Sequence, residues 1–153
     1  MRLVVQRVTR ASVRAGDDQL GEIGRGAVIL AGIGIDDTPE IVDRMAAKLV
    51  GLRYFGDPEG RTNLAITDVG GSFLVVSQFT LYADVRRGRR PGFTPAALPE
   101  VAEPLVDRFV ERLRSAGPHV ETGRFGAEMS VELENEGPFT LMLDSDRDLG
   151  GAD

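Results

Sequence analysis

Hydrophobic and polar positions divide the chain into strand-like and helix-like stretches. Residues 2–13 are rich in valine and threonine and predict a first strand, and residues 19–23 predict a second strand after a turn. The continuous apolar run at 27–31 is typical of a central strand. Apolar residues then recur at helical spacing over 41–52 and again over 98–116, so each segment predicts a helix with one face on the core.

Local signals set the expected ends of these helices. Asp37 or Thr38 is the expected N-cap of the first helix, with Pro39 in its first turn. Gly117 and the proline after it end the second helix. Pro104 lies inside the second apolar pattern, which predicts that this helix either begins near Pro104 or kinks there.

The pattern in the C-terminal third of the chain predicts strands. Residues 119–122 predict a short strand, and residues 129–134 alternate apolar and charged side chains, as a half-buried strand does. Turn-forming residues at 135–138 separate this stretch from a last strand at 139–143. Residues from about 144 to 153 predict a frayed acidic tail. Residues 61–71 show no regular pattern, although residues 52–55 before them predict a short strand.

Composition and charge limit the classes of protein to which the chain can belong. A chain of 153 residues fits one domain, 1–153. The absence of cysteine excludes disulfides and thiolate catalysis and predicts a reducing, cytoplasmic location. We expect no signal peptide and no membrane span, because charge appears at Arg2 and no apolar run is long enough. The net charge of −6 disfavours nucleic acid overall, yet four basic residues form a local cluster: Arg86, Arg87, Arg89 and Arg90.

The stretch from Ser72 to Tyr82 is the strongest candidate for a site. Its apolar half predicts a buried strand, and three hydrogen-bonding residues follow at once: Ser77, Gln78 and Thr80. One interpretation is a strand end whose polar side chains satisfy local backbone groups. The other is an active-site edge that opens onto the basic loop.

Several chemistries have no support in the residues. His119 is the only histidine and has no evident partner, so neither an acid–base pair nor a metal site is predicted. No dinucleotide fingerprint or phosphate loop is present, and no cofactor is expected. A hydroxyl nucleophile at Ser77 or Thr80 would lack an obvious base. A hydrolase built on this chain would therefore rely on backbone donors and on its substrate.

Two separated motifs together carry a resemblance to a known family. Ser77-Gln78-Phe79-Thr80-Leu81 and the segment 135–140, which reads Asn-Glu-Gly-Pro-Phe-Thr, resemble the paired signature of the D-aminoacyl-tRNA deacylases. The resemblance extends to residues 6–13, 63–64, 87–93 and 122–125 and covers essentially 1–143. One position departs from the pattern, because Phe139 stands where the family usually has valine.

The resemblance implies a fold and an activity. It implies a homodimer of α/β build, with layered mixed or antiparallel sheets and two main helices packed on one side. The implied reaction is hydrolysis of the ester of D-aminoacyl-tRNA, and also of glycyl-tRNA mischarged on tRNA(Ala), as a proofreading step. The implied partner is tRNA, with no DNA, no membrane, no metal and no cofactor.

The resemblance also assigns roles to residues. Gly137 and Pro138 would be joined by a cis bond and would reach into the partner subunit's site, where their carbonyl oxygens reject L-amino acids, and Arg7 would brace them. The implied substrate-binding residues of the same motif are Asn135, Phe139 and Thr140. The implied catalytic segment is Ser77, Gln78, Phe79 and Thr80, with backbone N–H groups as an oxyanion hole and the ribose 2′-hydroxyl assisting. The arginine cluster at 86–90 would dock tRNA.

Three alternatives stay open. The chain could be a deacylase of a related branch with altered specificity, or a non-catalytic RNA-binding module. It could also hydrolyse small D-amino acid esters without tRNA. The arginine loop and the lack of a side-chain base disfavour the last of these.

Overall fold

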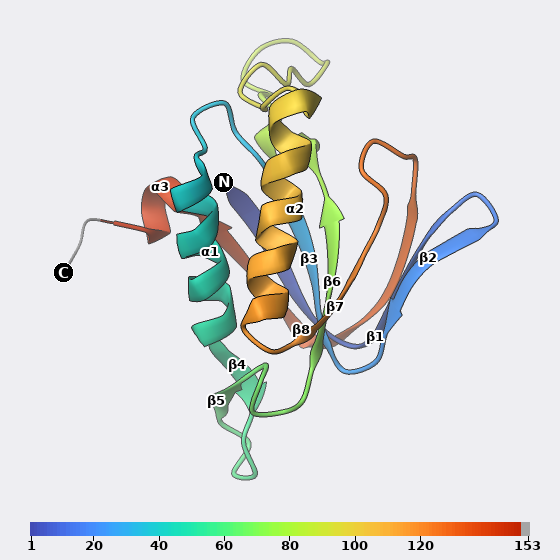
Figure 1. The fold of residues 1–153 in the computed structure, drawn as a ribbon, viewed down its shortest axis with the longest axis vertical. Helices are drawn as coiled ribbons and strands as arrows, with labels where there is room; N and C mark the ends of the chain where they lie inside the picture. The colour runs from blue at the N-terminus through green and yellow to red at the C-terminus, as the bar shows by residue number, and fades with distance from the viewer. Residues whose placement is uncertain (151–153) are drawn as a thin grey trace.

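The computed structural model describes residues 1–150 and is dominated by one mixed sheet (Figure 1). The sheet has the order β2-β1-β3-β6-β7, and β8 pairs with β1 as well. Its strands are β1 (Arg2–Ala15), β2 (Asp18–Ile23), β3 (Gly26–Gly32), β6 (Ser72–Ser77), β7 (His119–Thr122) and β8 (Ser130–Asp144). The first half of β1 pairs with β3, its second half pairs with β2, and β8 follows both halves. Because β2 also packs near β7, the sheet is nearly closed, like a barrel.

Two helices cover one face of this sheet, as the resemblance implied (Figure 1). They are α1 (Pro39–Gly51), which begins at the predicted N-cap Thr38, and α2 (Pro99–Ser115). Strand β3 explains the apolar run at 27–31: Ala27, Ile29 and Ala31 join the core under the helices, while Val28 joins a smaller core on the other face. A strand that is buried on both faces needs apolar side chains at successive positions.

Helix α2 matches the predicted span of 98–116 at both ends. It begins at Pro99, with Leu98 as N-cap, and ends at Ser115, so the alternative of a start near Pro104 is wrong. Pro104 has no backbone N–H, so the carbonyl of Glu100 lacks its usual partner within the helix. The buried side chains of Ala102 and Leu105 lie on either side of this proline, which indicates that packing on the sheet outweighs that loss.

Two predictions about strands were wrong. Residues 61–71 are not wholly irregular, because β5 (Thr62–Ala65) pairs with β4 (Arg53–Gly56) as a separate small hairpin. The two predicted strands at 129–134 and 139–143 are one continuous strand, β8, which carries a bulge where the sequence predicted a break. Both errors arise where pairing with a distant strand decides the structure.

The prediction of a frayed tail is wrong for residues 144–150, which the structure describes. Residues after β8 form α3 (Ser145–Asp148), and Ser145 is buried. The Ser145 N–H donates to the Met1 carbonyl at 2.8 Å, and the Met1 amino group donates to the Ser145 hydroxyl at 2.6 Å. Residues 151–153 of the predicted tail lie outside the described part. No helix within residues 1–150 is long and apolar enough to cross a membrane.

Candidate active site

The site lies where parallel strands end. Strands β3, β6 and β7 run in parallel, so their carboxyl ends meet at one edge of the sheet. Ala31 of β3 is opposite Ser77 of β6, and the Gln78 N–H donates to the Ala31 carbonyl at 2.8 Å. Ligands commonly bind at such an edge, because side chains and free backbone groups from several strands converge there.

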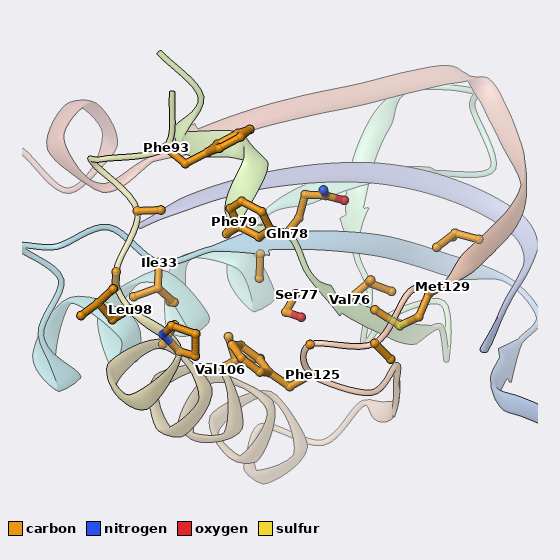
Figure 2. Close-up of a pocket in the computed structure, with 18 residues that line it drawn as sticks. Ile33, Val76, Ser77, Gln78, Phe79, Phe93, Leu98, Val106, Phe125 and Met129 are labelled. Atoms are coloured by element: carbon orange, nitrogen blue, oxygen red, sulfur yellow. The ribbon is translucent and has the colours of Figure 1, made fainter. Parts of the chain in front are cut away.

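A cavity of about 490 Å³ opens at this edge (Figure 2). Figure 2 shows Ser77 between the aromatic pair Phe79 and Phe93 on one side and Phe125 on the other. Most of its lining is apolar and comes from Ile33, Val76, Leu98, Val106 and Met129 in addition to the aromatic residues. An apolar cavity with a few polar groups, here from Ser77 and Gln78, is typical of a small-molecule site.

The segment after β6 forms a short 3₁₀ turn, η1 (Phe79–Tyr82). The backbone N–H groups of Phe79 and Thr80 head this turn and have no acceptor among residues 1–150. The Thr80 hydroxyl accepts a hydrogen bond from the side-chain amide of Gln78. Phe79 is 56% exposed and packs edge-on against Phe93, with ring centroids 5.0 Å apart. The turn therefore offers two free backbone donors beside an aromatic wall.

Among the described residues, the side chain hydrogen-bonded to the Thr80 hydroxyl is the amide of Gln78, which is not a base. His119 pairs with Ser72, the first residue of β6, whereas Ser77 is the last residue of that strand. At roughly 3.3 Å per residue, the strand separates these two ends by about 16 Å. His119 is exposed there and contacts Glu121 at 3.1 Å. His119 therefore lies at the opposite end of β6 from Ser77.

The basic loop begins close to the same cavity. Asp84 and Gly92 exchange two backbone hydrogen bonds, of 2.7 and 2.9 Å, at the base of the loop. Arg86 is bound to the Asp84 carboxylate by two hydrogen bonds, of 2.9 and 2.7 Å, which lower the pKa of Asp84 to about 2. The other three arginines of the cluster are exposed: Arg87, Arg89 and Arg90. Because Phe93 follows the loop and packs on Phe79, the loop lies beside the cavity.

The second motif forms the bulge of β8. Gln6 pairs with Thr140 and Val8 with Asn135, so Arg7 alone faces residues 136–139. Arg7 donates to the Glu136 carbonyl at 3.1 Å and to the Tyr54 carbonyl at 2.7 Å. Its guanidinium also lies over the Phe139 ring, 4.6 Å from the centroid. Arg7 therefore contacts both ends of the bulge that carries Gly137 and Pro138.

Asn135 closes the bulge from inside. Its side-chain amide donates to the carbonyls of Arg7 and Phe139, each at 2.9 Å, and its oxygen accepts from the Phe139 N–H at 3.0 Å. The bond between Gly137 and Pro138 is cis, as the resemblance implied, and both residues are exposed. The described chain therefore presents Gly137 and Pro138 outward on a bulge whose base is held by hydrogen bonds.

The structure brings only one motif to the cavity. Ser77, Gln78 and Phe79 line it, and Thr80 follows in the turn. None of the residues of the second motif lines it, and Thr140 is an exposed strand residue opposite Gln6. Phe139 instead stacks on Tyr54, with centroids 6.2 Å apart and an angle of 17° between the rings.

Sequence reasoning missed the opposite wall of the cavity. The sequence indicated only a position on the apolar face of a helix for Leu98 and a half-buried strand position for Met129, and it carried no functional signal for Val106. The only sequence pointer to this wall was Phe125, which belongs to the resembling segment 122–125.

A family model and curated relatives show the family of this chain. The family described as D-Tyr-tRNA(Tyr) deacylase matches residues 4–144. The chain is 56% identical to the D-aminoacyl-tRNA deacylase of Symbiobacterium thermophilum over 147 residues, which cover 96% of this chain and 97% of that one. It is 57% identical to the D-aminoacyl-tRNA deacylase of Roseiflexus sp. strain RS-1 over 145 residues, with 95% and 94% covered. A solved structure named c-Myc DNA Unwinding Element Binding Protein is similar with a TM-score of 0.89 and 41% identity, covering 94% of this chain and 98% of that one.

Proposed function

The chain belongs to the D-Tyr-tRNA(Tyr) deacylase family, and from this premise we propose that its cavity hydrolyses the ester of D-aminoacyl-tRNA without a side-chain nucleophile. The enzyme is a D-aminoacyl-tRNA deacylase, and aminoacyl-tRNA is its substrate. The observation that carries the proposed chemistry is the pair of free N–H groups at Phe79 and Thr80, beside an apolar cavity.

In this reaction a water molecule attacks the ester carbonyl carbon, and the carbonyl oxygen becomes an oxyanion. The N–H groups of Phe79 and Thr80 donate to that oxyanion, and a donor of this kind typically lowers the barrier by about 2.7–4 kcal/mol. The bond from the carbonyl carbon to the ribose oxygen then breaks. The neighbouring 2′-hydroxyl orients the attacking water and relays one of its protons to the departing ribose oxygen, so no side-chain base is needed. The products are the free amino acid and tRNA.

Selectivity for the D-amino acid is assigned to Gly137 and Pro138 of a partner subunit. Both residues are exposed and lie outside the lining of the chain's own cavity, which is why a second copy of the chain is proposed to supply them. A backbone carbonyl in a bulge whose base is fixed cannot rotate away as a side chain can. It therefore rejects an L side chain by a steric clash. Glycine has no side chain to reject, so glycyl-tRNA mischarged on tRNA(Ala) is also a proposed substrate.

The arginine loop is proposed to dock the tRNA backbone. Arg87, Arg89 and Arg90 are exposed beside the mouth of the cavity, in a chain whose net charge is −6. Local positive charge of this kind binds phosphates without reading sequence. A cytoplasmic location fits a tRNA substrate.

The test is deacylation by the purified protein of D-tyrosyl-tRNA, with L-tyrosyl-tRNA as the matched control. We expect rapid hydrolysis of the D form and little of the L form, and a homodimer by light scattering. Binding of tRNA without hydrolysis would point to an RNA-binding module. Equal hydrolysis of a small D-tyrosine ester would point to an esterase that does not need tRNA. A single-stranded DNA competitor distinguishes tRNA docking from the DNA binding that the name of the structural relative attributes to that protein.

A further inference from the structure

The turn that carries the free N–H groups has no anchor in the hydrophobic core. None of the residues of η1, Phe79–Tyr82, is buried. At its start, the Gln78 N–H holds the chain to β3 through the Ala31 carbonyl. Because no apolar side chain of the turn is buried in the core, the end of the turn at Tyr82 depends on polar contacts.

Arg2 makes two of those contacts. Its guanidinium donates to the Leu81 carbonyl at 3.0 Å and lies over the Tyr82 ring, 4.5 Å from the centroid. The same guanidinium donates to the Asp144 carboxylate at 3.0 Å, which fixes its orientation from the opposite side. Arg2 therefore connects the end of η1 to β1 and to the end of β8.

Asp37 provides the other contact. Its side chain is 5% exposed, and one of its oxygens accepts from the Gly34 N–H at 2.6 Å and from the Tyr82 hydroxyl at 3.3 Å. Its other oxygen accepts from the Met1 amino group. Burial, and then the negative charge of Asp37, raises the pKa of Tyr82, so its hydroxyl stays protonated and remains a donor.

The Tyr82 ring packs against the backbone of Gly34. A Cβ at Gly34 would lie 2.7 Å from two carbons of that ring, so the ring rests directly on the backbone. The neighbouring residue Ile33 lines the cavity. The contacts that hold Tyr82 are thus continuous with the cavity wall.

We propose that Arg2, Asp37 and Tyr82 are positioning residues that hold η1 so that the N–H groups of Phe79 and Thr80 point at the ester carbonyl. The inference rests on the proposed function. An oxyanion donor acts only when it lies about 2.7–3.1 Å from the developing charge. A misplacement of about 1 Å can reduce the rate on the order of 100-fold. These three residues touch no part of the cavity themselves, so they act only through the turn.

The experiment is single-turnover deacylation of D-tyrosyl-tRNA over a range of enzyme concentrations, with the wild type, Tyr82→Phe, Arg2→Gln and Arg2→Lys. The maximal rate constant reports positioning, and the half-saturating enzyme concentration reports tRNA binding. We expect Tyr82→Phe and Arg2→Gln to lower the maximal rate about 10-fold or more with binding within about twofold of wild type. Arg2→Lys keeps a cation at the turn and should recover part of the rate.

Arg44→Gln is the matched control. Arg44 also holds a backbone carbonyl, that of Leu149 at 2.7 Å, but it does not contact the turn. It should keep the wild-type rate. Tyr82→Phe removes only one oxygen from a partly exposed side chain and should fold, which a melting curve verifies.

Three outcomes would overturn the inference. The first is a folded Tyr82→Phe and Arg2→Gln that both retain the wild-type maximal rate. The second is a loss confined to the half-saturating concentration, and the third is an equal loss in Arg44→Gln. Wild-type protein that fails to deacylate D-tyrosyl-tRNA would overturn the proposed function itself, and with it the inference.

Discussion

The turn after β6 and the bulge of β8 differ in the hydrogen bonding of their backbone groups. The turn leaves two N–H donors free at its head, those of Phe79 and Thr80. The bulge binds its own donors and acceptors at its base through Asn135 and Arg7 and leaves Gly137 and Pro138 outside the pairing of β8 with β1. Free donors suit the stabilisation of an oxyanion, whereas fixed carbonyls suit rejection of a side chain. The difference predicts that damage to the turn reduces rate and that damage to the bulge reduces selectivity.

The largest expected effect comes from removing a donor of the turn. Phe79→Pro deletes the Phe79 N–H at the first position of η1, where proline is tolerated. Phe79→Ala removes the same ring and keeps the N–H. We expect Phe79→Pro to lower kcat for D-tyrosyl-tRNA by about 100-fold to 1,000-fold relative to Phe79→Ala. Equal rates for the two variants would show that this N–H is not used.

Loss of the amide that closes the bulge should act on selectivity instead. Asn135→Leu leaves the Phe139 N–H without its partner, so we expect the ratio of D to L hydrolysis to fall on the order of tenfold. Leaving such a group unpaired also costs about 1–3 kcal/mol of stability. Asn63→Ala, in the β4–β5 hairpin, is the control for a stability loss alone. An unchanged ratio in a folded Asn135→Leu would separate the bulge from selectivity.

The arginine loop should change affinity and leave both rate and selectivity intact. Replacing Arg87 and Arg90 with glutamine should weaken tRNA binding and reduce the slope of log K against log salt by roughly 0.7–0.9 for each lost phosphate contact. Arg86→Gln should do less, because Asp84 already neutralises that guanidinium. Titrations at several salt concentrations measure the slope. An unchanged slope in the double variant would show that tRNA lies elsewhere.

The smallest effect is expected outside both regions, at the contact between α1 and α2. Hydrogen bonds from Arg108 and Arg112 hold the pKa of Asp43 well below its usual value. These two ion pairs therefore stabilise the fold above the unfolded pKa of the Asp43 carboxyl, about 3.9, and their contribution fades as pH falls below that value. Asp43→Asn should lower Tm slightly at neutral pH, with a difference from wild type that shrinks toward pH 3. Deacylation rate and D/L ratio should not change, and a difference in Tm that grows in acid would contradict the assignment.

Local chemistry made much of this architecture predictable. The cap at Thr38, the apolar run of β3 and the helical stripe of α2 each follow from residues near one another in the sequence. The parts of the fold that were not predicted depend on contacts between residues far apart in the sequence. The bulge of β8 is closed by a hydrogen bond between Asn135 and the Arg7 carbonyl, and α3 is held by Met1. Periodicity cannot report such contacts.

The same limit applies to the site. The segment Ser77–Thr80 was found from its polar residues at a strand end, and it does meet the cavity. The contacts behind it involve Arg2, Asp37 and Tyr82, which lie far apart in sequence and carry no shared motif. No pattern in the sequence predicted that these three residues converge on one turn.

The central claim is that backbone donors and the substrate, not a side-chain nucleophile, carry the reaction. The direct test compares Thr80→Ala acting on normal D-tyrosyl-tRNA with wild type acting on tRNA whose terminal adenosine lacks the 2′-hydroxyl. Loss of a true nucleophile reduces kcat on the order of 10⁶-fold. We predict that Thr80→Ala loses only about 10-fold to 100-fold in single turnover, less than loss of an oxyanion donor, and that the deoxy substrate loses far more. Normal reaction of the deoxy substrate together with an inactive Thr80→Ala would identify Thr80 as the nucleophile and contradict the account.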